Sequence, residues 1–298
     1  MIIDKAGNIT DRILLLGRKE SCVYLVNGGS EYMLVGGGMI HIVPDVLEQL
    51  KKFNIDENKI SRIVILHAHF DHSGIVPFFK QRWPWARVAA SSRAKELLST
   101  EKVIQSMDML NQGILSMYQK EEKAKNLGIS FSKIDVEEVL EDDHIFNCGD
   151  LEFKVLAVPG HSTCSIALYL QSEKVLFASD AGGIPSEKGV FCAANSNFDL
   201  YQQSLERMAK YDVEVHLPEH FGALTGDDGR NFLHKSIKNA TETRTLMEDS
   251  LRNTGDVQKS IKEITDKWVT EGRASVLSRD VTEMVVAQMF RYLAKQIL

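Results

Sequence analysis

Short runs of apolar, strand-forming residues alternate with turn signals over residues 1–90. These runs are long enough for strands and too short for helices, and Asn27-Gly28-Gly29, which lies between two of them, is typical of a hairpin turn. The pattern predicts strands over Arg12–Leu16, Cys22–Val26, Glu31–Val35 and Arg62–Leu66. It also predicts a helix over Pro44–Leu50, because proline lies in its first turn and apolar residues follow at helical spacing.

The rest of the chain changes from mixed structure to helices alone. Helical spacing over about 92–125 predicts a helical insert. Further strands are predicted over Phe153–Val158, Ser165–Leu170, Lys174–Ala178 and Val213–Leu217, and helices over 230–252, 256–270 and 280–297. The last helix carries an apolar stripe that includes Met289 and Leu293. This order favours an α/β (α+β) sandwich with a helical extension packed on it.

Composition and charge narrow the class of protein. The 298 residues contain 35 Lys and Arg against 41 Asp and Glu, a net charge of −6 without a basic tract, so we expect no nucleic-acid partner. No apolar run reaches the roughly 18 residues of a membrane span, and the N-terminus does not resemble a secretory signal. The 4 cysteines are scattered without a C-x-x-C pair, as in reduced proteins. We therefore expect a soluble cytoplasmic protein with no membrane partner.

A cluster of potential metal ligands follows the strand predicted over Arg62–Leu66. It reads His67-Ala68-His69-Phe70-Asp71-His72. In a strand end, His67 and His69 point the same way because side chains alternate, whereas Asp71 and His72 lie one step beyond, where the chain turns. This spacing supplies ligands for two adjacent metal pockets. A loop whose histidines only form hydrogen bonds explains the cluster less well.

Other polar residues share this position at the end of an apolar strand. They are His161, which follows Pro159-Gly160; Asp180, which follows Ser179; and His220, which follows Pro218-Glu219. One such residue would ordinarily be a cap or a turn residue. Three of them after the first cluster indicate a shared site. His41, His144, His216 and His234 match no ligand position, and we expect them to be surface or core residues.

The order of these motifs resembles the metallo-β-lactamase-fold hydrolase superfamily over roughly residues 10–225. The resemblance implies a four-layer αββα sandwich with metals at one edge of the paired sheets. It implies a first metal held by His67, His69 and His161, a second held by Asp71, His72 and His220, and Asp180 bridging both. One departure is that many members have Asp-Thr-Gly in the early strand, where this chain has Val35-Gly36-Gly37-Gly38. The aspartate at that point supports the ligands from behind.

A looser resemblance concerns the added helices. The chain length, the insert with Met109-Leu110-Asn111-Gln112 and the helical C-terminal third are similar to the quinolone-signal response (PqsE-like) thioesterases, whose extra helices cover the active site and whose site can hold iron. We therefore expect a catalytic domain over residues 1–228, with the insert at about 92–125. Residues 229–298 are expected to form a helical extension that caps the active site, with Met289 or Leu293 lining an apolar access route.

Two metals about 3.5–4 Å apart can share one water and lower its pKa toward 7. The expected cofactors are two transition-metal ions, with Zn first and Fe or Mn as alternatives. The expected enzyme is a dinuclear hydrolase that uses the bridging hydroxide on a small acyl ester or thioester, with Asp71 as the catalytic residue that orients the hydroxide. Alternatives are a lactonase, a phosphodiesterase, or a regulatory, partner-binding protein on the same scaffold. The expected partner is a small acyl substrate, and a homodimer is compatible with the sequence.

Overall fold

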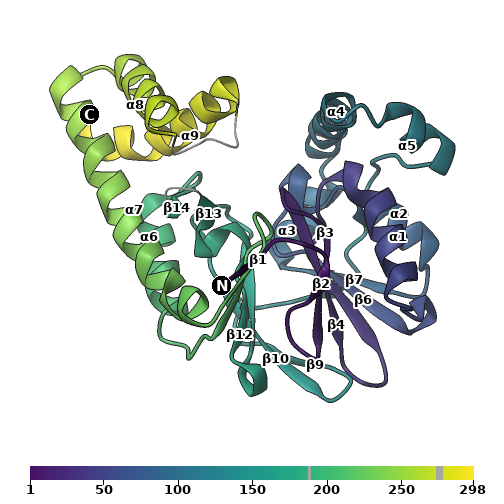
Figure 1. Cartoon of the computed structure of the whole chain (residues 1–298). Coiled ribbons are helices and arrows are strands. Elements are labelled where there is room, and N and C mark those ends of the chain that lie inside the picture. Colours follow the sequence, from purple (N-terminus) through teal and green to yellow (C-terminus); the bar gives the residue numbers. More distant parts are fainter. Residues whose placement is uncertain (187–188, 273–277) are drawn as a thin grey trace.

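Two β-sheets form the centre of the computed structural model, which describes residues 1–186, 189–272 and 278–298 (Figure 1). The sheet called here the N-terminal sheet contains β2 (Gly7–Asn8), β3 (Ile13–Arg18), β4 (Ser21–Asn27), β5 (Tyr32–Val35), β6 (Ile60–Val64), β7 (Arg87–Ala90) and β8 (Glu138–Val139), in that order across the sheet. Strands β2 to β5 pair antiparallel, and β5 to β8 pair parallel.

The second sheet, called the C-terminal sheet, has the order β1-β16-β15-β12-β11-β10-β9. Its strands are β1 (Ile2–Ile3), β9 (Ile145–Cys148), β10 (Leu151–Ala157), β11 (Ile166–Leu170), β12 (Val175–Phe177), β15 (Val215–Leu217) and β16 (Ala223–Thr225). A separate hairpin joins β13 (Ile184–Ser186) to β14 (Gly189–Phe191).

Helices cover the outer face of each sheet (Figure 1). The helices of the N-terminal half are α1 (Val43–Lys52), α2 (Val76–Arg82), α3 (Ser92–Ser99), α4 (Glu101–Met117) and α5 (Glu121–Leu127). Those of the C-terminal half are α6 (Phe198–Met208), α7 (Asp227–Thr254), α8 (Val257–Glu271) and α9 (Arg279–Ile297). Of these, α4, α5, α8 and α9 lie beyond the end of the sheets (Figure 1). The predicted αββα sandwich is confirmed. None of the helices in the described ranges is long and apolar enough to cross a membrane.

Successive side chains of a strand point to opposite faces of its sheet, and in this protein both faces are covered, which explains why the apolar runs are continuous. In β4, Val23 and Leu25 pack toward the helices, whereas Tyr24 and Val26 pack against the other sheet. Both faces are therefore buried, which removes the polar positions of a half-exposed strand. Across the two sheets, the ring of Tyr24 meets that of Phe177 edge to face, with centroids 5.8 Å apart.

The predicted strands and helices are all present, with ends shifted by a few residues. Residues 92–125 are helical, as predicted, and divide into α3, α4 and most of α5. Gly17, which the pattern places between strands, lies inside β3 and pairs with Cys22. Sequence analysis does not predict α2, α6 or the strands β1, β2, β7, β8, β9, β13, β14 and β16.

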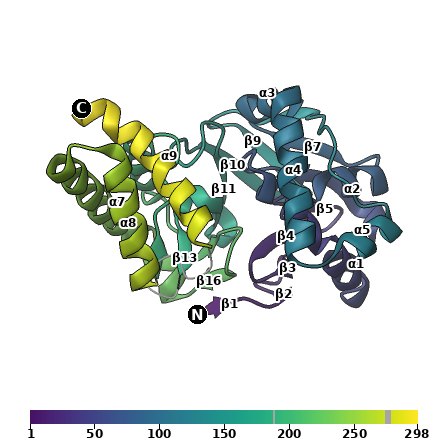
Figure 2. The ribbon, with the colours of Figure 1, turned by 90° about the horizontal axis from the view of Figure 1, so that it is seen from above.

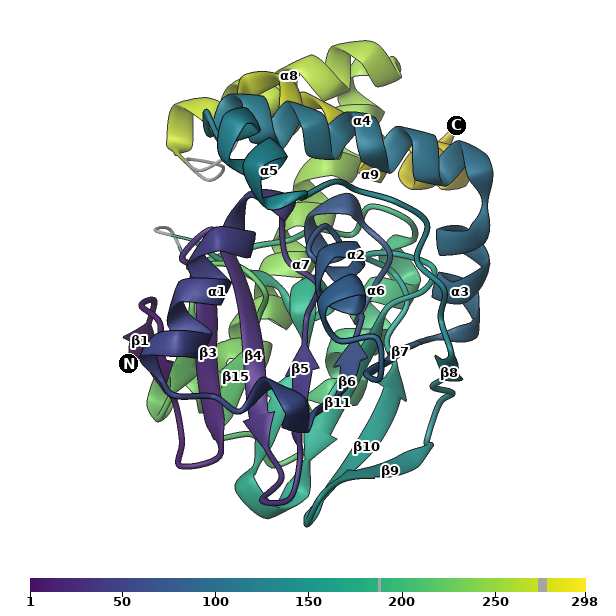
Figure 3. The ribbon, with the colours of Figure 1, turned by 90° about the vertical axis from the view of Figure 1, so that its right-hand side faces the viewer.

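Of the extension, α7 packs on the C-terminal sheet, whereas α8 and α9 project beyond the end of the sheets, at the end where α4 and α5 also lie (Figure 1). Helix α7 contacts α6, β14, β15 and β16, and α8 and α9 pack on α7. The expectation that Met289 and Leu293 line an access route is wrong, because both are fully buried in one core with Leu251 and Trp268. Seen from above, α4 and α9 lie at this end on either side of the middle of the molecule (Figure 2). Helix α4 contacts the 3₁₀ turn Phe70–His72, called the ligand turn below (Figure 3 shows this helix from the side). A capping role for residues 229–298 stays a prediction.

A buried histidine connects the insert to the loop between β3 and β4. The ring of His41 stacks on that of Tyr118, directly after α4, with centroids 3.9 Å apart and planes 7° apart. Its Nε2 lies 3.2 Å from the Glu20 carboxylate. The hydrogen bond with His41 holds the pKa of Glu20 at about 2, against an ordinary value of 4.5.

We expect a chain that ends at residue 228 to lose cooperative folding. Removing α7 to α9 would expose the outer side of α6, including Phe198, Leu205 and Met208, which share a core with the extension. Thermal unfolding followed by circular dichroism checks this, with a chain ending at Gly255 as the comparison because it keeps α7. A sharp unfolding transition in the shorter chain would show that the extension is separable.

The Glu20–His41 contact predicts part of the acid limb of stability. A lowered carboxyl pKa stabilises the fold above pH 4.5, and this contribution is lost as the pH falls toward 2. Because Glu20 is partly exposed, we expect Glu20→Gln to cost about 1–2 kcal/mol at pH 5 and much less at pH 3. Urea unfolding of both proteins at each pH measures the difference. An equal difference at both pH values would contradict the assignment.

Candidate metal centre

Strand ends from both sheets deliver the candidate ligands to one place. The ligand turn follows β6 of the N-terminal sheet. His161 follows β10, Asp180 lies in the 3₁₀ turn Ser179–Gly182 after β12, and His220 follows β15, all in the C-terminal sheet. The structure thus brings together every ligand residue predicted from the sequence. Although these residues are far apart along the chain, their side chains lie within hydrogen-bonding or near-contact distance of one another.

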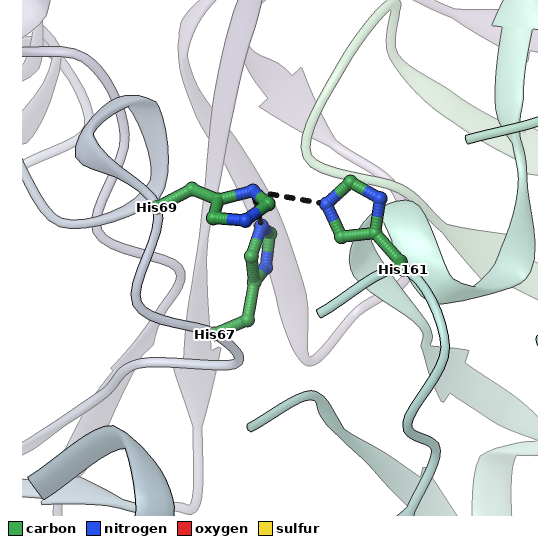
Figure 4. A group of neighbouring side chains, drawn as sticks. All are labelled: His67, His69 and His161. Atoms are coloured by element: carbon green, nitrogen blue, oxygen red, sulfur yellow. Dashed lines mark hydrogen bonds between the residues drawn. The ribbon is translucent and has the colours of Figure 1, made fainter. Parts of the chain in front are cut away.

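Three imidazole rings converge in the first group (Figure 4). Nδ1 of His69 lies 3.1 Å from Nε2 of His67 and 3.0 Å from Nε2 of His161. The opposite nitrogen of His161, Nδ1, donates to the carbonyl of Ala193 at 2.8 Å, in the tautomer that leaves a lone pair on Nε2. These are the residues that the resemblance assigns to a first metal.

Asp71, His72 and His220 form a second group. Nε2 of His72 lies 3.1 Å from Nε2 of His220. Oδ2 of Asp71 lies 3.5 Å from the first of these nitrogens and 3.7 Å from the second. Nδ1 of His220 donates to the carbonyl of Glu20 at 2.7 Å, so its Nε2 also faces the group with a free lone pair.

Asp180 lies between the two groups. Its Oδ2 is 3.1 Å from Nε2 of His72 and 3.5 Å from Nε2 of His161, and its Oδ1 is 3.7 Å from Nε2 of His220. Oδ1 is buried and has no hydrogen-bond partner among the described residues. One carboxylate therefore presents an oxygen to each group, as a bridging ligand must.

The electrostatics of the cluster favour metal binding. Burial lowers the pKa of His67 and His69, the latter to about 3, so both rings are neutral at pH 7 and carry the lone pairs that coordination needs. Burial alone would raise the pKa of Asp180, but His72 and His220 hold it well below the ordinary value. The carboxylate is therefore ionised.

These residues fit a transition metal. Two imidazole nitrogens 3.0–3.1 Å apart can share at most one proton, and the cluster contains three such pairs. A cation placed among them would satisfy these lone pairs together with the orphan Oδ1 of Asp180. Imidazole nitrogens with carboxylate oxygens suit Zn, Fe or Mn.

Sequence analysis missed two polar residues behind the ligands. Glu219, which looks like a turn residue between Pro218 and His220, is only 1% exposed, and its Oε2 lies 3.0 Å from Nδ1 of His72. The hydroxyl of Ser179 donates to the same Oε2 and lies 3.1 Å from Nδ1 of His67. The available signal was that each is adjacent in sequence to a ligand.

The remaining histidines lie outside the cluster, as expected. His144 and His234 are exposed. His216 is buried in the C-terminal sheet, with its ring 4.7 Å from that of Phe232. The Sγ of Cys164 accepts from the backbone N–H of Ala68 at 3.3 Å, which makes this thiol part of the packing beside the ligand turn.

Comparisons with known proteins agree with this fold. The acyl-coenzyme A thioesterase MBLAC2 of Homo sapiens is 25% identical over 226 residues, which cover 72% of this chain and 78% of that protein. A metallo-beta-lactamase family protein of Thermus thermophilus has the same fold, with a TM-score of 0.65 at 19% identity over 94% of this chain and 93% of that one. A flavo di-iron protein of Thermotoga maritima gives a TM-score of 0.60 at 16% identity over 86% of this chain and 71% of that one. The model of the metallo-beta-lactamase superfamily matches residues 17–220, and the chain belongs to that family.

Proposed function

We propose that this protein is a dinuclear metal-dependent hydrolase of small acyl thioesters or esters. The observation that carries the proposal is the convergence of two ligand groups on the buried carboxylate of Asp180. His67, His69 and His161 would hold one ion and Asp71, His72 and His220 the other. When bound, such a pair lowers the pKa of a shared water and polarises a substrate carbonyl.

Asp71 is suited to the proton transfers of this reaction. Its side chain is 22% exposed, against 5% for Asp180, so Asp71 is the carboxylate of the two that an incoming substrate can reach. Although burial opposes it, His72 and His220 lower the pKa of Asp71, which keeps it ionised as a hydrogen-bond acceptor. In that state it orients the attacking water, accepts the proton that the water loses on attack, and then passes this proton to the leaving thiolate or alkoxide.

The cysteines are poor candidates for the nucleophile. All four are buried and unpaired. Burial raises the pKa of Cys22, Cys148 and Cys192 to about 12, so these thiols stay protonated near pH 7. This supports a mechanism in which water attacks without a covalent intermediate on the chain.

Support for a thioester comes from sequence. Acyl-coenzyme A thioesterase MBLAC2 matches this chain over 72% of its length, although at only 25% identity. Lactones and phosphodiesters remain the alternative substrates, because the superfamily fold alone does not select the reaction.

The proposed function is tested with the metal-loaded protein and a panel of acyl-coenzyme A thioesters, aryl esters, lactones and phosphodiesters. We expect turnover of a thioester or ester to exceed that of the other classes. Selective cleavage of a phosphodiester would replace the proposed substrate. Negligible turnover on every class, together with a stoichiometric protein partner recovered by affinity capture, would favour the regulatory alternative.

The number of ions is checked by elemental analysis of metal-loaded variants. We expect about two ions per chain in the wild type and about one in His220→Ala, because that histidine serves only the second group. Asp180→Asn should lower occupancy of both, because one carboxylate faces both groups. His234→Ala, an exposed histidine outside the cluster, is the control. A wild-type value that stays at one ion under metal-replete conditions would contradict the dinuclear site.

Hydrolysis should depend on metal and be independent of thiols. We expect a chelator to abolish turnover and the metal to restore it, while Cys192→Ser keeps most of the activity. Cys164→Ser should also retain most activity, although its Sγ contacts the backbone beside the ligand turn. Initial rates on the best substrate measure this. Loss of turnover on thiol blocking, with metal content unchanged, would overturn the water mechanism.

A further inference from the structure

Glu219 is a buried carboxylate that none of the steps above uses. One of its oxygens, Oε2, lies 3.0 Å from Nδ1 of His72 and accepts the hydroxyl hydrogen bond of Ser179. Ser179 in turn lies 3.1 Å from Nδ1 of His67. A single oxygen therefore reaches one histidine of each ligand group, directly in one case and through a hydroxyl in the other.

The backbone on both sides of this carboxylate is shaped to hold it. Ser179 has φ +48°, a left-handed conformation that is uncommon for a residue with a side chain. Gly36, directly after β5, has φ +93°, and a Cβ placed on it would lie 2.6 Å from Oε1 of Glu219. The space in front of Gly36 is thus filled by the Glu219 side chain, and any residue with a Cβ at position 36 would displace it.

The absence of a side chain at position 36 allows the Glu219 carboxylate to lie there. Strand β5 is followed by Gly36-Gly37-Gly38, so position 36 carries no side chain. A side chain projecting from position 36 would enter the volume that Glu219 occupies. The glycine therefore leaves room for the carboxylate that the loop after β15 supplies.

We propose that Glu219 is the positioning residue of the metal centre, acting on His72 directly and on His67 through Ser179. Its charge favours a proton on Nδ1 of His72 and, through Ser179, on Nδ1 of His67. Each ring then presents the Nε2 lone pair to its ion. Such carboxylate–histidine pairs fix the ring and make it a stronger ligand.

The geometry argues against Glu219 as a ligand itself. Nε2 of His72 faces Asp180 and His220, at 3.1 Å from each, whereas Glu219 lies at the opposite nitrogen of the same ring. The ring therefore separates Glu219 from the ions that His72 would bind. With 1% exposure, Glu219 is also closed to substrate.

The test measures metal affinity rather than turnover, by competition with a chromophoric chelator, using Zn(II) and Co(II). Glu219→Gln keeps the shape and removes the charge, and we expect it to weaken both sites about 10–100-fold. Ser179→Ala removes the hydroxyl that joins Glu219 to His67 but leaves Oε2 beside Nδ1 of His72, so it should weaken the first site more than the second. Glu214→Gln is the matched control, because Glu214 lies just before β15 and its carboxylate binds exposed Lys174 on the surface.

Absorption spectra of the Co(II) proteins supply a readout that a purely structural role would not move. We expect the ligand-field bands to shift in Glu219→Gln and to stay unchanged in Glu214→Gln. Circular dichroism of each metal-free variant confirms folding. If Glu219→Gln fails to fold, Glu219→Asp provides a second route, because it keeps the charge but withdraws the carboxylate from Nδ1 of His72, and it should weaken both sites as well.

Wild-type metal affinities and an unchanged Co(II) spectrum in a folded Glu219→Gln protein would overturn the proposal. So would Ser179→Ala weakening the second site as strongly as the first. The inference rests on the metal centre of the proposed function and not on its acyl substrate. A wild type that binds two ions but hydrolyses no thioester or ester would therefore refute the substrate and leave the role of Glu219 standing.

Discussion

A carboxylate buried among imidazole rings is the interaction on which the rest of this structure depends. Asp180 is 3% exposed, and an ionised carboxylate at such a position costs several kcal/mol unless it is compensated. The surrounding rings compensate it only while they keep their orientation. Each of two rings is accordingly held from behind by a backbone carbonyl: His161 by that of Ala193, and His220 by that of Glu20. The hydrogen bonds behind the rings are thus as necessary for stabilising the Asp180 carboxylate as the contacts that the rings make with it.

Backbone contacts beside the site hold the ligand-bearing segments of the two sheets in place. A Cβ on Gly37 would lie 2.3 Å from the carbonyl oxygen of His72, so the backbone of the ligand turn rests directly on the segment after β5. The N–H of Cys22, in β4, donates to the carbonyl of Glu219 at 2.8 Å, so the N-terminal sheet also positions the loop that carries His220. The two ligand groups stay in register because the sheets are linked at the site itself as well as through their shared core.

The ligands were predictable from the sequence because each follows an apolar strand, and strand ends at one edge of a sandwich lie together. Glu219 was not predictable in this way. It adjoins a ligand, but the role of its carboxylate depends on the space beside Gly36, which is distant in sequence. The apolar stripe on α9 predicts burial but not the partner: Met289 and Leu293 are buried, as their spacing indicates. Periodicity does not say which surface covers them. That information lies in the long-range packing of α7 to α9.

Burial varies across the site, and this variation separates structural from chemical roles. The side-chain exposure of the carboxylates rises from 1% at Glu219 to 5% at Asp180 and 22% at Asp71. The first two are enclosed by protein, so their charges can be fixed before any substrate arrives. Asp71 belongs to the ligand turn, which α4 of the insert contacts. Under the proposed function, a substrate that reaches Asp71 would approach beside the insert, and insert residues would be better placed than the buried stripe of α9 to select its acyl group.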